Sequence, residues 1–471
     1  MPLRARPWPL ALALISALHA APVIAMPGLP PLGRAPSVDP LEVEVISEVL
    51  ENGLTVVIEE QRRTPEVAVQ LHVRVGSRDE GPAERGCAHL FEHLMFEGSA
   101  HAPGRTYDEA TTAAGMENNA WTTADETVYT ALLSPEGLDL LLFLESDRLG
   151  WLSSVTAADL KNQQDVVLQE RAEGYAAVFG REGDAMTRLL WPEGHPYHHP
   201  VIGTVADIRG FSAEAALALH SRAYSPGNTV LVIVGDVDAE VALASARRWF
   251  SDVPAGAGRL ARATAAETPW APARQDGMLE DALEERSLSL AWPGPPADHP
   301  DAAALQVLAM ALSNGRGTRL DDALLYDRRR ASDAGAVFWD GDLGGELHLW
   351  ATGKRVRLPR LARTLEEALR SFSTSPATEA ELQRAKGALR AALIDQLSTP
   401  EGRAERIGAC VARGQAPDCA QAQLAAAQRV SAADLARVID QWLGPAARRS
   451  LSVVPVGDKG ALPGAILVEL P

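Results

Sequence analysis

The pentapeptide His89-Leu90-Phe91-Glu92-His93 constrains the fold of this chain more tightly than any other segment. Apolar, helix-forming residues flank it on both sides. On a helix, residues four positions apart share one face, so the two imidazoles would lie side by side with Glu92 next to them. Two neutral imidazoles suit Zn²⁺, and a catalytic zinc site adds a third protein ligand and an open position for water. The pattern predicts a metal site; the alternative is two helix histidines in ordinary polar contacts.

A candidate third ligand, Glu170, lies downstream in a helical-looking run, residues 165–171. The order H-x-x-E-H inverts the H-E-x-x-H of other zinc peptidases. With a Glu at this spacing, the sequence resembles the pitrilysin/insulinase family of inverzincin peptidases, which includes the mitochondrial processing peptidase. The resemblance implies that His89, His93 and Glu170 bind Zn²⁺ and that Glu92 is the general base for hydrolysis of a peptide substrate.

The chain has 471 residues, more than one ordinary domain. The resemblance implies an α+β fold of two homologous domains, each a mostly antiparallel sheet with helices packed on one face, as in the mitochondrial processing peptidase. We expect a zinc-binding peptidase domain at residues 41–255 and a second homologous domain without a metal site at residues 281–471. Residues 256–280, rich in Ala, Pro, Gly and Thr, are the expected linker.

The first 25 residues have the pattern of a cleavable signal peptide. Two arginines precede a short apolar run, residues 10–18, and small residues end at Ala25. Residues 26–40 are rich in Pro and Gly and predict an extended arm. No other stretch approaches the apolar length of a membrane span. We therefore expect a periplasmic or secreted protein without a membrane span in its mature form; an uncleaved anchor is the alternative.

The net charge and the cysteines bear on which partners this chain can bind and on which residues can be metal ligands. The formal net charge of −18 argues against binding to nucleic acid or to an anionic membrane. In an oxidising compartment Cys410 and Cys419 could pair, which would leave Cys87 free. Because Cys87 lies two residues before His89, a role as a metal ligand is conceivable. A buried, unreactive thiol is the favoured interpretation, since the ligand set is complete without it.

Residues 118–129 (NNAWTTADETVY) predict two strands around a polar turn. In the resembled family the matching segment is an edge strand beside the zinc, to which a substrate peptide adds as a further strand. The resemblance implies substrate contacts for Asn119, Ala120 and Tyr129; an ordinary core hairpin is the alternative. Where many relatives carry another acid, two turns before the ligand Glu, this chain has Gln163, which can donate and accept hydrogen bonds but carries no charge.

Three histidines, His195, His198 and His199, lie close together in the sequence and invite a second metal assignment. Prolines interrupt the segment and the spacing does not suit a helix. The segment resembles the H-P-Y-G-x-P-[VI]-x-G loop of the same family, so a structural loop is the preferred interpretation.

The second half of the chain contains no H-x-x-E-H. In self-sufficient members of the resembled family this half supplies an Arg and a Tyr that hold the substrate. Aligned on Arg319-Leu320, this chain has Leu325 and Ser332 at those positions. The resemblance therefore implies the metal-bearing subunit of a heterodimer, with a paralogous subunit supplying the Arg/Tyr pair. Two rival functions remain: a non-catalytic scaffold that retains the metal site, and a metal-storage or metallochaperone module.

Overall fold

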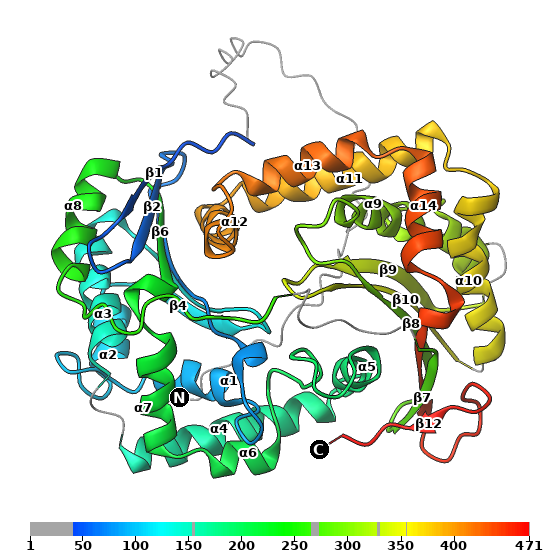
Figure 1. Cartoon of the computed structure of the whole chain (residues 1–471), viewed down its shortest axis with the longest axis horizontal. Helices are drawn as coiled ribbons and strands as arrows, with labels where there is room; N and C mark the ends of the chain where they lie inside the picture. The colour runs from blue at the N-terminus through cyan, green and yellow to red at the C-terminus, as the bar shows by residue number, and fades with distance from the viewer. Residues whose placement is uncertain (1–40, 153–155, 265–272, 327–329, 355, 471) are drawn as a thin grey trace, which may run out of the picture.

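The computed structural model describes residues 41–152, 156–264, 273–326, 330–354 and 356–470. The expected signal peptide (1–25) and extended arm (26–40) lie outside these ranges. Two halves lie side by side, each built around its own sheet (Figure 1). Within the described ranges, no helix combines the length and the apolar character that a membrane crossing requires.

The first half contains six strands and eight α-helices among the described residues. They are β1 (Ile46–Val49), β2 (Thr55–Glu60), β3 (Val67–Val73), α1 (Cys87–Leu94), α2 (Thr106–Ala113), β4 (Glu117–Thr122), β5 (Thr127–Leu133), α3 (Leu138–Gly150), α4 (Ala157–Ala176), α5 (Glu182–Leu190), α6 (Val205–Gly210), α7 (Ala213–Ala223), β6 (Thr229–Gly235) and α8 (Ala239–Phe250).

The second half adds a second six-stranded sheet, more helices and a short π-helix at Asp321–Tyr326. Its elements are β7 (Gln275–Asp281), β8 (Arg286–Gly294), α9 (Ala302–Ser313), β9 (Asp333–Trp339), β10 (Gly345–Gly353), α10 (Leu358–Thr374), α11 (Glu379–Gln396), α12 (Pro400–Ala412), α13 (Cys419–Arg429), α14 (Ala432–Trp442), β11 (Arg449–Pro455) and β12 (Ile466–Leu467).

Five strands of each sheet share one topology, whereas the sixth differs: β1 lies antiparallel to β2, and β12 lies parallel to β7. The strand order is β1-β2-β6-β3-β5-β4 in the first and β12-β7-β11-β8-β10-β9 in the second. In each set of five the last strand returns to lie parallel to the first of the set, β6 beside β2 and β11 beside β7, while the adjoining hairpin strands pair antiparallel. The expected fold class, two homologous α+β domains with mostly antiparallel sheets, is therefore confirmed.

The central strand β6 reads Thr-Val-Leu-Val-Ile-Val-Gly, a nearly continuous apolar run, because both of its faces are covered. Side chains alternate across a strand. Leu231 and Ile233 face the core shared with α3 and α8, whereas Val230, Val232 and Val234 lie in a separate cluster with residues of α12. The sheet of the first half is thus buried on one side by its own helices and on the other by a helix from the second half.

The exchange is reciprocal, as Figure 1 shows for α12 beside the first sheet and α5 beside the second. Met186 and Leu189 of α5 pack with Leu451 and Val453 of β11 in the second sheet. Each half therefore supplies one helix that packs on the sheet of the other, although both helices stay within the expected ranges, 41–255 and 281–471. The expected linker, 256–280, is too long, because β7 starts at Gln275 to pair with β11.

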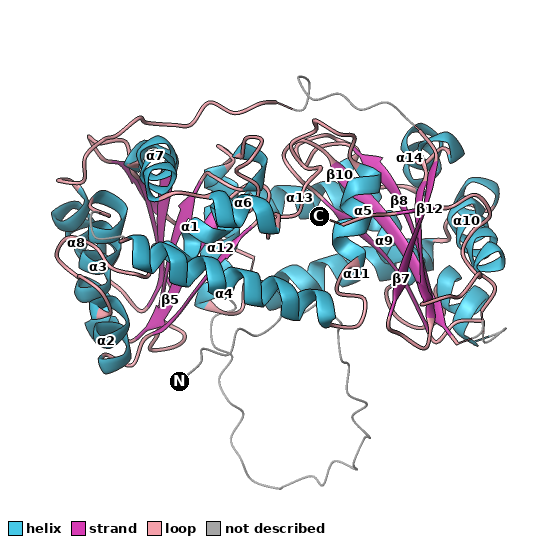
Figure 2. Ribbon diagram, turned by 90° about the horizontal axis from the view of Figure 1, so that it is seen from below, coloured by secondary structure: helices cyan, strands magenta, loops and turns pink. Residues whose placement is uncertain are grey.

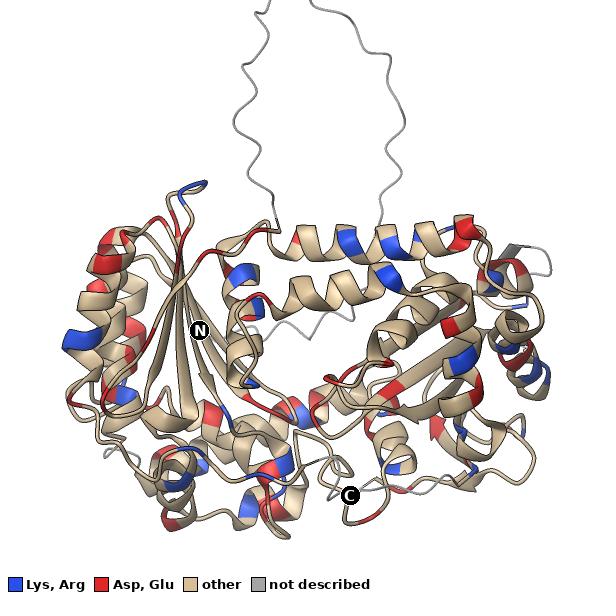
Figure 3. Ribbon diagram, turned by 45° about the horizontal axis from the view of Figure 1, so that its top comes forward, with Lys and Arg blue, Asp and Glu red and all other residues tan. Residues whose placement is uncertain are grey.

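Buried polar contacts join the halves as well. The Arg403 guanidinium of α12 forms a two-pronged ion pair with Glu59 of β2, with 2.7 Å from Nε to Oε2, and both side chains are almost fully buried. At the other end of the junction, Arg78 contacts both Asp125 of the first half and Asp342 of the second, at 2.7 and 3.2 Å. Figure 3 shows that residues of both charge signs are distributed over both halves.

A disulfide joins Cys410, near the end of α12, to Cys419, the first residue of α13. Reducing it is expected to lower the free energy of unfolding by about 2–3 kcal/mol, because the unfolded chain regains the freedom of a short closed loop. Urea unfolding with and without a thiol reductant measures the difference. In the double variant Cys410→Ser/Cys419→Ser, the reductant should have no effect; an equal effect there would show that the loss of stability does not come from this disulfide.

Candidate metal centre

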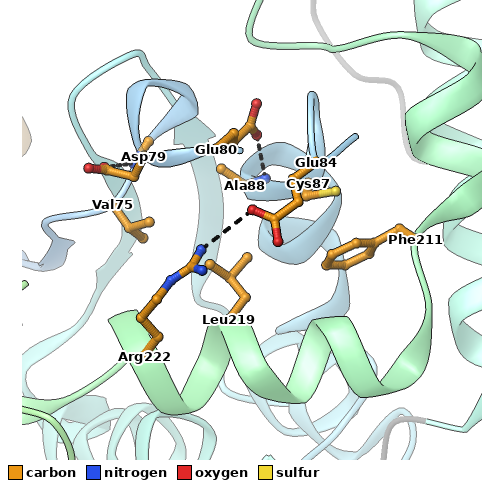
Figure 4. A pocket seen from close by; sticks show the side chains of 10 residues that line it. Val75, Asp79, Glu80, Glu84, Cys87, Ala88, Phe211, Leu219 and Arg222 are labelled. Atoms are coloured by element: carbon orange, nitrogen blue, oxygen red, sulfur yellow. Dashed lines mark hydrogen bonds and ion pairs between the residues drawn. The ribbon is translucent and has the colours of Figure 1, made fainter. Parts of the chain in front are cut away.

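The helix α1 begins without a Ser, Thr or Asn cap. Its N-cap, Gly86, has a φ of +92°, and the first backbone groups are bound by Glu80, whose carboxylate accepts from the N–H of Gly86 at 2.9 Å and of Ala88 at 2.8 Å. His199 lies 3.0 Å from the same carboxylate. Figure 4 shows Glu80 reaching Ala88 at the start of the helix. This buried cap fixes where α1 starts and which face it presents.

One face of α1 is anchored in the core. Leu90, Phe91 and Leu94 are fully buried there. His89 and His93 lie on another face and are half-buried, with rings 4.9 Å apart between centroids and nearly perpendicular. The i, i+4 spacing therefore places the two imidazoles together, as the sequence predicts.

Glu170 of α4 completes a cluster with these histidines. Its Oε2 lies 3.6 Å from His93 Nε2 and 3.9 Å from His89 Nε2. The three candidate ligand atoms lie within 4.8 Å of one another, and among the described residues no other group of His, Cys, Asp and Glu converges in this way. Tetrahedral ligands at zinc–ligand distances near 2.1 Å are about 3.4 Å apart, and the two histidine–glutamate distances, 3.6 and 3.9 Å, are close to this value.

The protonation of the cluster also fits a metal. Burial, reinforced by the neighbouring His93, lowers the pKa of His89 to about 3. Burial also lowers the pKa of His93, although a hydrogen bond to Gln163 opposes the change. Both rings are therefore neutral near pH 7 and each keeps a free nitrogen lone pair. Two neutral imidazoles and one carboxylate form a donor set that suits Zn²⁺.

Glu92 stands beside the cluster without belonging to it. Burial raises its pKa to about 7, a hydrogen bond from Thr122 opposes the rise and the charge of Glu170 adds to it. The Thr122 hydroxyl donates to Glu92 Oε2 at 2.6 Å. A carboxylate with a pKa near neutrality and a fixed orientation can accept and return a proton. The sequence pointed to Glu92 but not to Thr122, which lies on β4 and meets α1 only after folding.

Gln163 lies behind His93. Its Oε1 is 3.2 Å from His93 Nδ1, and its amide nitrogen bonds Glu97, beyond the end of α1. Gln163 carries no charge, but it forms hydrogen bonds on both sides of its amide, as its side chain allows. Glu97 was not singled out in the sequence, because nothing in its spacing distinguishes it from any other surface acid.

The three residues expected to contact substrate separate into two groups. β4 is the edge strand of its sheet next to β5; Asn119 is exposed there and Ala120 half-buried. Tyr129 of β5, by contrast, is 1 % exposed, its hydroxyl bonds that of Tyr224 at 2.9 Å, and the Arg148 guanidinium covers its ring. The expectation for Tyr129 is wrong in this structure, since a peptide could not reach a side chain within the core.

The histidine-rich loop has structural contacts. His198 Nδ1 lies 2.7 Å from the Trp191 carbonyl, His199 joins the Glu80 cap, and the His195 ring stacks on Trp191. Cys87 is buried, lines a small pocket with Phe211 and Leu219 (Figure 4), and does not belong to the His-His-Glu group. Burial, with a smaller contribution from Glu80, raises the pKa of its thiol, which disfavours the thiolate that a metal needs.

The second half has no Arg or Tyr at the two aligned positions. Leu325 lies half-buried in the π-helix, and Ser332 donates its hydroxyl to the Thr352 carbonyl at 3.0 Å.

A doubled α+β fold with a His-His-Glu cluster on its first repeat defines the class of protein. The family model described as Insulinase (Peptidase family M16) matches residues 55–176, and the one described as Peptidase M16 inactive domain matches residues 210–389. An uncharacterized zinc protease of Mycobacterium leprae is 30% identical over 376 residues, which cover 77% of this chain and 81% of the relative. The chain therefore belongs to the M16, or pitrilysin/insulinase, peptidase family.

Solved structures share the fold. A protease from Helicobacter pylori superposes with a TM-score of 0.80 at 23% identity, covering 88% of this chain and 100% of that one. The first half of the periplasmic protease PqqL from Escherichia coli gives a TM-score of 0.73 at 20% identity, with 89% and 94% covered.

Proposed function

We propose that this chain is the metal-bearing subunit of an exported zinc endopeptidase that cleaves peptides and unfolded polypeptide segments. The observation that carries the proposal is the convergence of His89, His93 and Glu170 beside a buried Glu92 whose pKa lies near neutrality. The name of the Mycobacterium leprae relative, a zinc protease, supports it.

In this proposal His89, His93 and Glu170 hold the metal. Bound Zn²⁺ supplies Lewis-acid polarisation of the scissile carbonyl and lowers the pKa of a bound water. Glu92 accepts a proton from the attacking water on its carboxylate and later delivers it to the nitrogen of the leaving amine. The exposed edge of β4, at Asn119 and Ala120, holds the substrate backbone as an added strand.

Two further parts of the proposal concern the partner subunit and the cellular compartment. Leu325 and Ser332 stand where self-sufficient relatives have Arg and Tyr, so a paralogous subunit supplies that pair. Export to the periplasm or the exterior is supported by the Cys410–Cys419 disulfide, since disulfides persist in oxidising compartments. The word periplasmic in the name of the PqqL structure supports the same setting.

The test uses the purified full chain. We expect it to contain zinc and to cleave an unstructured, internally quenched peptide only weakly, with turnover appearing when a paralogue that lacks H-x-x-E-H but carries the Arg/Tyr pair is added. Full turnover by the chain alone would refute the partner requirement. A zinc-loaded pair that cleaves no peptide would favour the scaffold alternative, which the match of the second half to the inactive-domain model already makes the second candidate.

Thr122→Val should lower kcat of the active assembly about tenfold, because the lost hydrogen bond to Glu92 has a net value of about 1–1.5 kcal/mol. Zinc content, measured by atomic emission, should not change, since Thr122 touches no ligand atom. Thr122→Ser keeps the hydroxyl and should retain most of the activity. Equal losses in the Val and Ser variants would mean that packing, not the hydrogen bond, is responsible.

A further inference from the structure

A chain of hydrogen bonds leads away from the metal cluster through His93. The outer ring nitrogen of His93, Nδ1, lies 3.2 Å from Oε1 of Gln163 on α4. The amide nitrogen of the same Gln163 bonds Oε1 of Glu97, just beyond the end of α1. One amide from α4 thus joins an imidazole and a carboxylate that lie only four residues apart, at the end of α1.

The partners at the two ends determine how the amide must be oriented. An ionised carboxylate only accepts hydrogen bonds, so the NH₂ group of Gln163 must point to Glu97. Its oxygen then points to His93 and can only accept, so Nδ1 of His93 must carry the hydrogen. The electron pair of this neutral ring is consequently left on Nε2, the atom that lies 3.6 Å from Glu170.

If Glu97 were replaced by a group that both donates and accepts, the amide could turn over. Its NH₂ group would then face His93 Nδ1 and favour the other tautomer, in which the hydrogen sits on Nε2 and blocks ligation. The charge of Glu97 therefore selects the ligating tautomer at a distance of two hydrogen bonds.

His89 provides an internal comparison. Its Nδ1 is buried and has no hydrogen-bond partner in the described structure. Of the two imidazoles, only His93 is oriented by neighbouring polar side chains. The effect of removing the carboxylate should accordingly fall on one ligand and leave the other untouched.

We propose that Glu97 is a positioning residue of the metal site, which fixes the tautomer and orientation of His93 through the amide of Gln163. The proposal rests on the zinc site of the proposed function and deepens it, because it assigns the carboxylate partner of a metal-binding histidine to a residue with no direct contact to that histidine. Outer hydrogen-bond partners of this kind typically change metal affinity by 10–100-fold when they are removed.

The experiment measures zinc affinity of the purified full chain by competition with a chromophoric chelator, so it needs neither a partner nor activity. Glu97→Gln and Gln163→Leu should each weaken zinc binding about tenfold. The double variant Glu97→Gln/Gln163→Leu should bind no more weakly than Gln163→Leu, because both changes break one chain of contacts. The exchange variant Glu97→Gln/Gln163→Glu should recover wild-type affinity, since a carboxylate then accepts directly from His93.

Glu173→Gln is the matched control. Glu173 is exposed on α4, its nearest partner is Gln169, and its charge acts on Glu170, but it takes no part in the Gln163 contacts. Removing that charge should change zinc affinity less than threefold. An equal loss in the Glu97→Gln and Glu173→Gln variants would overturn the proposal in favour of a general effect of negative charge.

A metal-free readout completes the test. In the chain stripped of zinc, ¹⁵N NMR of the imidazoles should show the Nδ1–H tautomer for His93, and Glu97→Gln should shift it toward a mixture. Additive losses in the double variant, or wild-type affinity in Glu97→Gln, would overturn the proposal while leaving the zinc site standing. Failure of the wild-type chain to bind zinc at all would overturn the zinc site and the proposal together.

Discussion

Glu92→Gln is expected to lower kcat for peptide hydrolysis about 10³-fold while leaving the zinc content unchanged. The amide has nearly the shape of the carboxylate and can still accept the hydrogen bond from Thr122. It cannot take a proton from water at neutral pH, and loss of a general base typically costs 10²–10⁴-fold. Zinc remains because Glu92 is not part of the His89, His93 and Glu170 cluster. Steady-state kinetics and atomic emission on the same sample measure both quantities.

Glu170→Gln provides the contrast, since it should lose zinc and activity together. Glu173→Gln, three residues along α4, should lose neither. If Glu92→Gln turned over substrate as fast as the wild-type chain, another group would have to be the base and the assignment of Glu92 would fall.

Arg403→Met is expected to lower the free energy of unfolding by about 3–5 kcal/mol. Methionine fills much of the same space but leaves the Glu59 carboxylate buried without its cation. An unpaired buried charge is costly, whereas the intact pair adds little compared with apolar residues of similar volume. Urea unfolding followed by circular dichroism measures the change.

The double variant Arg403→Met/Glu59→Leu should recover most of the lost stability, because no charge then remains buried. Arg248→Met is the exposed control: this arginine lies 3.7 Å from Asp139 at the surface, and its loss should cost less than about 0.5 kcal/mol. A double variant as unstable as Arg403→Met alone would show that packing of the long side chain, rather than the ion pair, is what the junction requires.

The metal cluster could be predicted because its information is local. On a helix, the i, i+4 spacing places His89 and His93 on the same face. The spacing typical of the resembled family then identified Glu170 as the third ligand. Thr122 and Glu97 carry no such pattern, since each becomes relevant only through one hydrogen bond formed across the fold. The prediction for Tyr129 was wrong for a related reason. Its place in a strand next to the edge was predictable, but the direction of its side chain, toward Tyr224 and away from solvent, was not.

The arrangement of the halves could be predicted only in part. The sequence predicted the helix that carries His89 and His93 and the two strands within residues 118–129, and the repeat of the domain followed from the family. The apolar face of α5 and that of α12 show that each helix is buried, but a pattern of apolar residues does not state against which sheet. The same limit applies to β7, whose first six residues lie in the expected linker and are recognised as a strand only when their partner β11 is known.

The reciprocal placement of α5 and α12 has a mechanical consequence. Each half contributes a helix that covers the sheet of the other half. The two halves therefore cannot swing apart about a hinge, because opening would expose the apolar faces of both sheets to water. A protease that cuts the connecting segment within residues 256–264 should leave two fragments that still migrate together during gel filtration. In the heterodimer that we propose, a polypeptide would therefore reach Glu92 through motion between the two subunits and not through bending within this chain.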